Sequence, residues 1–247
     1  MFEPFLEKKF DIKTYEGDKN GDLRIITLMN LFQDAADSHA SALNVGLEHC
    51  LRGGLAWVGS AYHIKINKLP KLHEEITIKT WPSIKNKLTA IREFEVANEK
   101  GGKLILASSQ WVLLNVEKKR PVSLDDNLPD FPNTPTRAVE TDFPKITEVT
   151  EHNFDKHFYV RFDDIDINDH VNNAIYPLWA TESVKDQFRL GHTPKEIEIA
   201  FKKEGLFGEM IRVNTLMEEK LSNHSVRGND DRELARVRIL WAENKVD

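Results

Sequence analysis

The chain of 247 residues lacks the features that define several classes of protein. Its single cysteine, Cys50, forms neither an internal disulfide nor a thiolate metal cage, and we expect no metal site and no cofactor. We interpret Cys50 as a packing residue, because the neighbouring His49 would not face it on a helix. No window approaches the roughly 20 apolar residues of a membrane helix. The N-terminus lacks the basic segment and apolar run of a secretory signal, so we expect a cytoplasmic protein.

An excess of positive charge is also absent, because the formal net charge is −6. A chain with this balance is not expected to bind nucleic acids. Basic residues nevertheless gather locally, at Lys65, Lys68, Lys71, Lys79, Lys85 and Lys87 and at Lys118-Lys119-Arg120. Most such runs are solvated faces, and the alternative is a surface for an acidic partner.

Periodicity in the first half predicts one strand, one helix and four further strands. Apolar residues recur at helical spacing from Leu28 to Leu43, with Thr27 as the expected N-cap and Asn44 and Gly46 as the end. Strands are predicted over residues 10–15, 55–66, 74–81, 88–98 and 103–116. Short turns between the last four indicate antiparallel pairing, because parallel strands need longer crossovers.

The second half repeats this order. A strand is predicted over residues 156–162, a polar loop over 163–173, a helix over 174–188, and strands over 196–203, 210–221 and 232–241. The proline-rich segment between the halves is either a semi-extended connection or a long packed loop. We therefore predict an internal duplication, with an N-terminal domain at 1–122, a linker at 123–150 and a C-terminal domain at 151–247. An antiparallel sheet around a long helix is an α+β architecture that fits a tandem hotdog fold, although other α+β sandwiches fit too.

The polar loop of the second half is the stretch most indicative of chemistry. If the segment is extended, Asp166, Asn168 and His170 project to one side. Three residues then lead into the helix, and their backbone amides would face an anion such as a developing oxyanion: Val171, Asn172 and Asn173.

Two structural interpretations compete with that one. An Asp- and Asn-rich segment is often only a turn followed by an N-cap, which would by itself explain Asn172 or Asn173. Calcium binding is the other, but the central glycine and the closing glutamate of an EF-hand loop are both missing.

The string Asp166-x-Asn168-x-His170-Val171-Asn172-Asn173-x-x-Tyr176 resembles the signature of acyl-acyl-carrier-protein (acyl-ACP) thioesterases. In the first half, Leu55-Ala-Trp57-Val and Ala107-Ser-Ser-Gln-Trp111-Val also resemble that family. The resemblance implies a double hotdog that hydrolyses fatty acyl-ACP and releases the free fatty acid.

In that family a catalytic glutamate follows two basic residues, and the matching run is Phe201-Lys202-Lys203-Glu204-Gly205. The resemblance therefore gives Glu204 this role. Many members carry a cysteine next, whereas this chain has Gly205, which supplies no thiol. Direct attack by activated water is the simpler hypothesis.

The expected roles follow from this chemistry. Glu204 and Asp166 form an acidic pair of which one activates water, His170 moves a proton or polarises the substrate, and Asn168 positions the water or the thioester. Glu182, His39 and Tyr176 are weaker candidates, interpreted as structural residues.

The resemblance also suggests where the substrate binds. The acyl chain would enter the first half, where the candidate lining residues are Leu28, Leu31, Phe32, Ala35, Trp57 and Trp111. Lys202, Lys203 or the basic residues between Lys65 and Lys87 would receive the acidic carrier. Alternatives are an acyl-CoA thioesterase and a non-catalytic acyl-thioester-binding module. A tandem hotdog can be a monomer or a homodimer.

Overall fold

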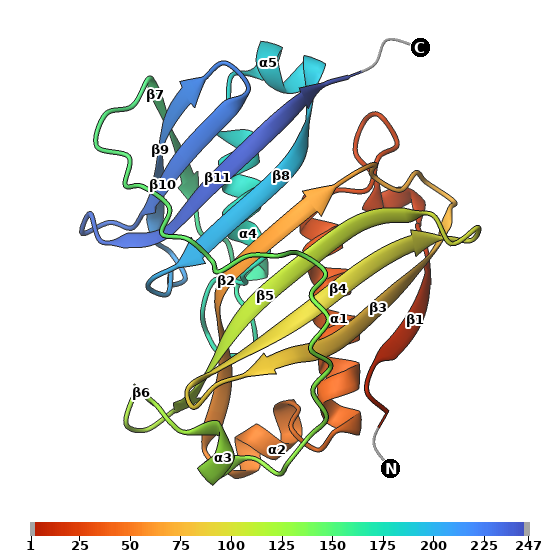
Figure 1. The fold of residues 1–247 in the computed structure, drawn as a ribbon. Coiled ribbons are helices and arrows are strands. Elements are labelled where there is room, and N and C mark those ends of the chain that lie inside the picture. The colour runs from red at the N-terminus through yellow and green to blue at the C-terminus, as the bar shows by residue number, and fades with distance from the viewer. Residues whose placement is uncertain (1–2, 245–247) are drawn as a thin grey trace. The chain divides into compact units, whose positions relative to one another are not determined.

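The computed structural model describes residues 3–244 as two compact units that divide between Phe143 and Pro144 (Figure 1). Each unit is an antiparallel sheet with helices on one face, so the α+β expectation is confirmed. Within residues 3–244, no helix combines the length and the apolar character that crossing a membrane requires.

The first unit contains five long strands and three α-helices. Its elements are β1 (Leu6–Asp11), the 3-10 turn η1 (Thr14–Glu16), α1 (Ile25–Ala42), α2 (Leu47–Arg52), β2 (Leu55–Ile66), β3 (Glu75–Lys85), β4 (Thr89–Asn98), β5 (Lys103–Asn115), β6 (Arg120–Pro121) and α3 (Leu124–Asn127). The strand order is β1-β3-β4-β5-β2, with every pair antiparallel and β6 added to β5.

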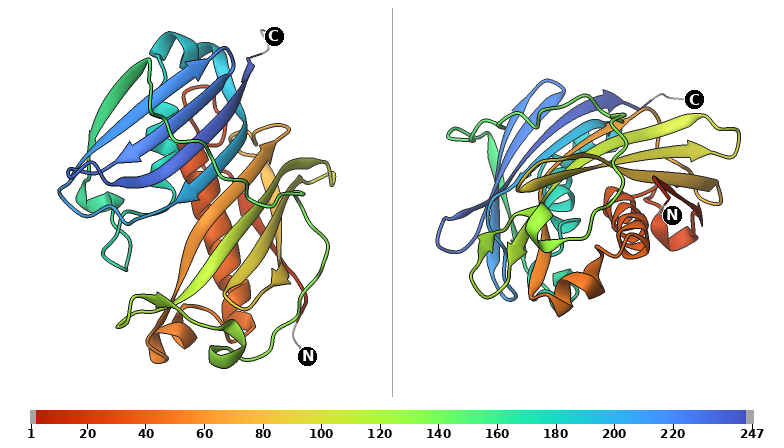
Figure 2. Two further views of the ribbon diagram at one scale, coloured as in Figure 1. Left: turned by 60° about the vertical axis from the view of Figure 1, so that its left-hand side comes forward. Right: turned by 60° about the horizontal axis from the view of Figure 1, so that its bottom comes forward.

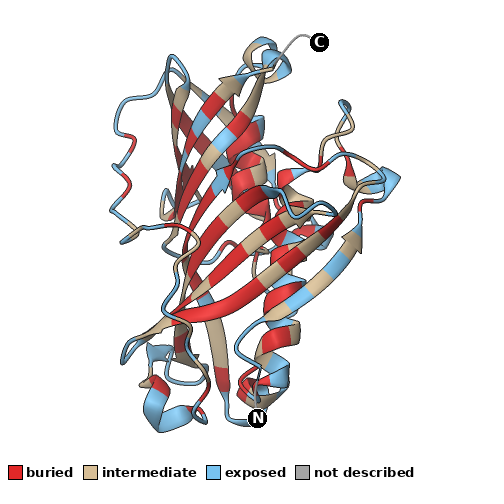
Figure 3. Ribbon diagram, turned by 45° about the vertical axis from the view of Figure 1, so that its right-hand side comes forward, coloured by how far each residue is buried: buried red, intermediate tan, exposed pale blue. Residues whose placement is uncertain are grey.

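Helix α1 covers one face of this sheet because its apolar residues recur every three or four positions. Leu28, Phe32 and Ala35 are fully buried, and the Phe32 ring stacks on Phe94 of β4 at 4.5 Å between centroids. Burying one such large side chain stabilises the fold by about 1.5–3 kcal/mol. In the right-hand view of Figure 2, α1 lies nearly end-on below the strands of its unit. Figure 3 shows buried positions interrupted by intermediate ones along β3 and β4.

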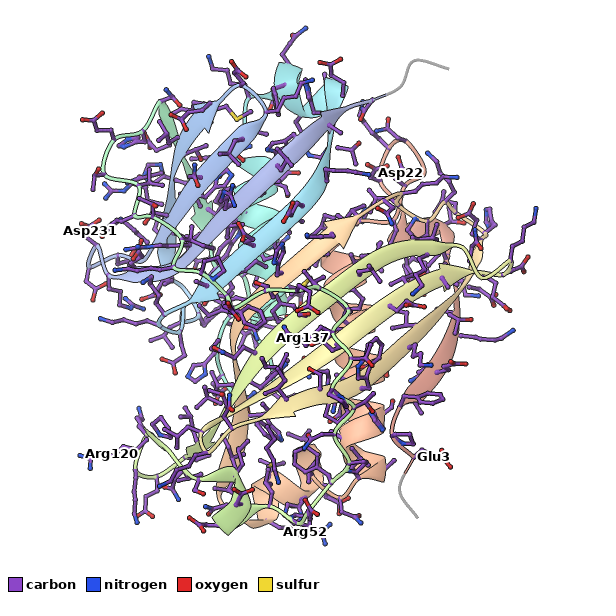
Figure 4. All side chains as sticks on the ribbon, in the orientation of Figure 1. Glu3, Asp22, Arg52, Arg120, Arg137 and Asp231 are labelled. Carbon is purple, nitrogen blue, oxygen red and sulfur yellow. The ribbon has the colours of Figure 1, made fainter. Side chains whose placement is uncertain are left out.

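The residues between the two halves are ordered and packed. In the first unit, the Trp81 indole donates a hydrogen bond to the Thr136 carbonyl at 2.8 Å, and Arg137 pairs with the buried carboxylate of Glu93 at 2.6 Å. Figure 4 shows Arg137 against the sheet face that this segment crosses. In the second unit, Arg236 donates to the Ile146 carbonyl at 2.9 Å. Of the two alternatives for residues 123–150, the structure shows the packed segment, divided at 143/144.

The second unit contains β7 (Phe154–Tyr159), the 3-10 turn η2 (Phe162–Asp164), α4 (Ile175–Glu182), α5 (Asp186–Gly191), β8 (His192–Phe201), β9 (Met210–Glu218), β10 (Leu221–Arg227) and β11 (Glu233–Glu243). The strand order is β7-β9-β10-β11-β8, and every pair is antiparallel. In both units the strand before the helix lies at one end of this order, and the strand after the helices lies at the other. The predicted duplication is therefore present in the topology.

Four local predictions were wrong. The strand expected over 10–15 is β1, which ends at Asp11, and the 3-10 turn η1 occupies Thr14–Glu16. The first helix begins at Ile25 with Arg24 as its N-cap, and Thr27 instead contacts the Glu16 carbonyl. The predicted helix over 174–188 is split into α4 and α5. Strand β10 was missed because its buried positions include Ser222 and His224, so it has no apolar alternation.

Candidate active site

The loop between β7 and α4 is closed by a buried carboxylate. Asp164 is 1% exposed, accepts a hydrogen bond from the Arg161 backbone N–H at 2.9 Å and pairs with the Arg161 guanidinium at 2.6 Å. The Asn172 N–H donates to the Asp164 carbonyl at 2.9 Å, and Ile165 forms an isolated bridge with Val171. The base of the loop is thus a narrow hairpin.

The tip of the loop is a tight turn. The Asp166 N–H donates to the His170 carbonyl at 2.8 Å, and the Asp166 Oδ1 atom accepts from the Asn168 N–H at 2.8 Å. Asp169 has φ 61°, the left-handed region that asparagine and aspartate tolerate. The expectation of an extended segment with three side chains on one side was therefore wrong. The turn instead brings Asp166 and His170 opposite each other.

Glu204 lies on a segment whose backbone is held on all sides. The Gly205 carbonyl accepts from the Val171 N–H at 2.9 Å, and the Gly205 N–H donates to the Tyr176 hydroxyl at 3.0 Å. Arg232 donates to the Glu204 carbonyl at 3.3 Å. The Glu204 side chain is exposed. The segment that carries Glu204 therefore adjoins the segment that carries Asp166 and His170, within one unit.

Two of the three expected oxyanion donors are already engaged. The Val171 amide donates to the Gly205 carbonyl and the Asn172 amide donates to the Asp164 carbonyl, so assigning them to the oxyanion was wrong. The Asn172 side chain accepts from the Ala174 N–H at 2.8 Å and so forms an Asx turn directly before α4, whose N-cap is Ala174. Within residues 3–244, the Asn173 N–H makes no hydrogen bond, and it stays the candidate donor.

The first unit contains the same loop in a second copy. The Asp18 Oδ1 atom accepts from the Asn20 N–H at 2.8 Å, the Asp18 N–H donates to the Asp22 carbonyl at 2.7 Å, and Gly21 has φ 73°. The Leu23 N–H donates to the Pro70 carbonyl at 2.8 Å. These bonds match those made by Asp166, Asn168, His170, Asp169, Val171 and Gly205 in the second unit.

The two copies differ at the positions of the candidate catalytic residues. Asp22, which pairs with Lys71 at 2.8 Å, stands where the second unit has His170, and Leu69 stands where it has Glu204. The Asp-x-Asn turn is common to both and so shapes the loop in either unit. Aligning Asp18-x-Asn20 with Asp166-x-Asn168 was the sequence signal that would have revealed this correspondence.

The candidate acyl-pocket residues fall into two groups. Leu28, Phe32 and Ala35 lie on the sheet-facing side of α1 and are fully buried, whereas Leu31, Trp57 and Trp111 are half-buried. The Trp57 indole donates to the Val45 carbonyl at 2.9 Å, so it packs beside the cluster under α2. Their contact with an acyl chain stays a prediction.

Cys50 and His39 are buried residues whose surroundings favour a structural role. Burial raises the pKa of the Cys50 thiol to about 11, so Cys50 is a poor nucleophile. His39 is 1% exposed, and burial followed by the nearby Arg92 lowers its pKa to about 4. Arg92 donates to the His39 Nδ1 atom at 3.2 Å, so His39 is a neutral core residue. Among residues 3–244, no three metal-ligating side chains are grouped so as to hold an ion.

The comparison with protein families decides the identity of this fold. The model of the acyl-ACP thioesterase N-terminal domain matches residues 4–130, and that of the C-terminal domain matches residues 147–243. This chain belongs to the acyl-ACP thioesterase family. It is similar to a chloroplastic acyl-[acyl-carrier-protein] hydrolase of Cuphea viscosissima, with 25% identity over 98% of this chain and 65% of the relative.

Solved structures of this family share the fold along the whole chain. An acyl-ACP thioesterase from Bacteroides thetaiotaomicron has a TM-score of 0.83 at 23% identity, covering 97% of this chain and 98% of that one. The 12:0-ACP thioesterase from Umbellularia californica has a TM-score of 0.84 at 22% identity, covering 99% of both chains. The tandem hotdog expectation is confirmed. The chain spans 61–65% of the length of the first curated relatives it matches.

Proposed function

We propose that this chain hydrolyses the thioester of fatty acyl-ACP, so that water and the acyl thioester give a free fatty acid and the carrier thiol. The family supports this reaction, and the curated relatives carry names of acyl-ACP hydrolases. We also propose that the protein acts in the cytoplasm, which fractionation of the source cells tests.

The observation that carries the proposal is the bond between the Val171 N–H and the Gly205 carbonyl. It joins the loop of Asp166 and His170 to the segment of Glu204, although the two lie far apart in the sequence. This bond supports the proposal that a carboxylate, an imidazole and the Asn173 amide form one site. Thioester hydrolysis needs those three functions: a base for water, a proton for the leaving thiolate and a donor for the oxyanion.

We assign the base to Glu204 in preference to Asp166. Asp18 makes the same turn as Asp166 in the unit that lacks Glu204 and His170, which indicates a structural contribution from the turn itself. Glu204 has no carboxylate counterpart, because Leu69 occupies that position. His170 then supplies the proton to the leaving thiolate, and Asn168 orients the substrate.

Replacing the base tests this assignment. We expect Glu204→Gln to lower kcat for acyl-ACP by about 10²–10⁴-fold, the range typical of losing a positioned base. Asp166→Asn should lower it less if Glu204 is the base. Asp18→Asn changes the equivalent turn of the first unit and is the matched control, expected to keep normal turnover. Normal turnover of Glu204→Gln with an intact fold would refute the assignment.

The carrier is tested by comparing acyl-ACP with acyl-CoA on one chain length. Within the basic residues between Lys65 and Lys87, Lys71, Lys79 and Lys85 are held in ion pairs, which leaves Lys65, Lys68 and Lys87 as the exposed members of that cluster for carrier docking. We expect charge reversal at these three to raise KM for acyl-ACP more than for acyl-CoA, because the acidic carrier loses attraction. Equal effects would argue against this docking surface, and faster turnover of acyl-CoA would favour the alternative substrate.

A further inference from the structure

The peptide groups on either side of Gly205 are held by four different partners. Arg232 donates to the Glu204 carbonyl at 3.3 Å, and the Gly205 N–H donates to the Tyr176 hydroxyl at 3.0 Å. The Gly205 carbonyl accepts from Val171, and the Leu206 N–H donates to the Glu209 carboxylate at 3.0 Å. The backbone beside the Glu204 side chain therefore has little freedom to move.

Tyr176 makes the bond in this set that comes from a buried side chain. It is 2% exposed on the second residue of α4, and its ring packs edge-on against Trp179 and Phe201. Burial, with a smaller contribution from Glu204, raises the pKa of the Tyr176 hydroxyl to about 12, so the group stays protonated. A fixed, neutral hydroxyl can hold the peptide group and does not act as a base toward the attacking water.

The duplicated loop of the first unit shows what happens where no catalytic glutamate is present. The position that corresponds to Gly205 is Pro70, which has no N–H, and the position that corresponds to Tyr176 is Leu28, which has no hydroxyl. The Leu104 carbonyl accepts from two successive backbone amides, as the Leu234 carbonyl does in the second unit. Two residues before each of these leucines, Gly102 therefore corresponds to Arg232. The other loop bonds, including Leu23 to Pro70 and Lys71 to Glu74, are kept.

From this comparison we propose that Tyr176 and Arg232 are positioning residues for Glu204. Both are present only in the unit whose loop carries the glutamate, and both bind the peptide that bears or follows it. The shared bonds are enough to form the loop, so the two additional ones restrict the direction of the Glu204 side chain. A displacement of about 1 Å at a reacting group can cost on the order of 10²-fold in rate. The inference rests on the proposed role of Glu204 as base.

The test is a double-mutant cycle between Tyr176→Phe and Glu204→Gln on acyl-ACP. We expect Tyr176→Phe to lower kcat by about 10–100-fold. KM should change less than about threefold, because substrate binding is not disturbed. In the Glu204→Gln background the same substitution should change kcat by less than about threefold, since there is no base left to position. Exposed Tyr159, substituted by Phe, is the matched control and should leave kcat unchanged.

Arg232→Met is a second variant, which removes the hydrogen bond to the Glu204 carbonyl. Arg232 directly precedes β11 and also pairs with Asp230 and Glu209, so urea unfolding is measured beside kcat to separate a loss of stability from a loss of positioning. We expect a loss of kcat that also vanishes in the Glu204→Gln background. Equal losses in both backgrounds, for either variant, would show a general structural role and overturn the inference. Normal kcat for Tyr176→Phe would overturn it as well, whereas normal kcat for Glu204→Gln would remove the proposed base itself.

Discussion

Position 205 shows how a single missing side chain constrains the chemistry. A Cβ atom there would lie 2.9 Å from the Val171 Cγ2 atom and 3.4 Å from both Leu234 Cδ1 and the Tyr176 hydroxyl. Val171 and Leu234 are buried, so neither moves without disturbing the loop. Glycine at this position thus permits the close approach of the two segments, and it also removes the thiol that the resemblance would place there.

We therefore expect Gly205→Cys to lower both stability and turnover. Overpacking of this kind costs about 1–3 kcal/mol, and the shift of Val171 would displace the loop that carries His170. Urea unfolding and steady-state kinetics on acyl-ACP measure the two effects. Gly191→Cys, where an added Cβ meets nothing within 4 Å, is the control. Turnover above the wild-type value would show that the thiol acts and that our packing argument is wrong.

One buried ion pair, between Arg137 and Glu93, helps to hold the segment that connects the units. The Glu93 side chain is fully buried and accepts hydrogen bonds from the Ser83 hydroxyl at 2.7 Å and the Ala138 N–H at 2.9 Å, besides its bond with Arg137. Ser108 also donates to it. A buried carboxylate with this many donors fixes the crossing of residues 137–139 over the sheet.

Removal of the cation should be costly at this element. We expect Arg137→Met to lower the free energy of unfolding by about 3–5 kcal/mol, because it leaves a buried charge without its partner. Arg52→Met is the control, since Arg52 pairs with Glu48 on an exposed helix face and such pairs contribute about 0–1 kcal/mol. Denaturant unfolding measures both. Equal effects of the two substitutions would mean that residues 137–139 are not held by the Arg137–Glu93 pair.

Among residues 3–244, two buried histidines have lowered pKa values, and one lies in each unit. His39 contacts Arg92 and the Glu3 carbonyl, and His224 contacts the Thr215 and Ser222 hydroxyls at 2.9 and 2.8 Å. Burial lowers the pKa of His224 to about 3 and is the main cause that lowers the pKa of His39 to about 4. Both pKa values lie below the value near 6.5 that histidine has in an unfolded chain.

This difference predicts acid sensitivity of the fold. Below pH about 6.5 the unfolded chain binds protons that the folded chain excludes, so stability is complete above that pH and falls as the pH drops toward 4. We expect His224→Gln to flatten the decline of unfolding free energy with acid, measured in urea between pH 8 and 4. Exposed His152→Gln is the control. An unchanged slope in His224→Gln would contradict the prediction.

Much of this architecture was determined by the sequence alone. The strand boundaries of β2, β4 and β5 were predicted to within a residue or two because their apolar alternation is strong. The polar loop before α4 and the run that contains Glu204 were singled out from residue types and resemblance, and both lie within residues 147–243, which match the C-terminal family model. The repeated order of elements was also visible, since hydrophobic period and turn residues are local signals.

Tertiary structure alone decided how those segments meet. The bonds of Gly205 to Val171 and Tyr176 join residues about 30 positions apart, and no local spacing specifies them. Contacts between distant segments also determined that the Val171 amide donates to the Gly205 carbonyl, and that the Ser222 hydroxyl of β10 accepts from the Trp241 indole of β11. Polar groups in a buried environment must find partners, and which partners are available depends on the register of strands and loops in space.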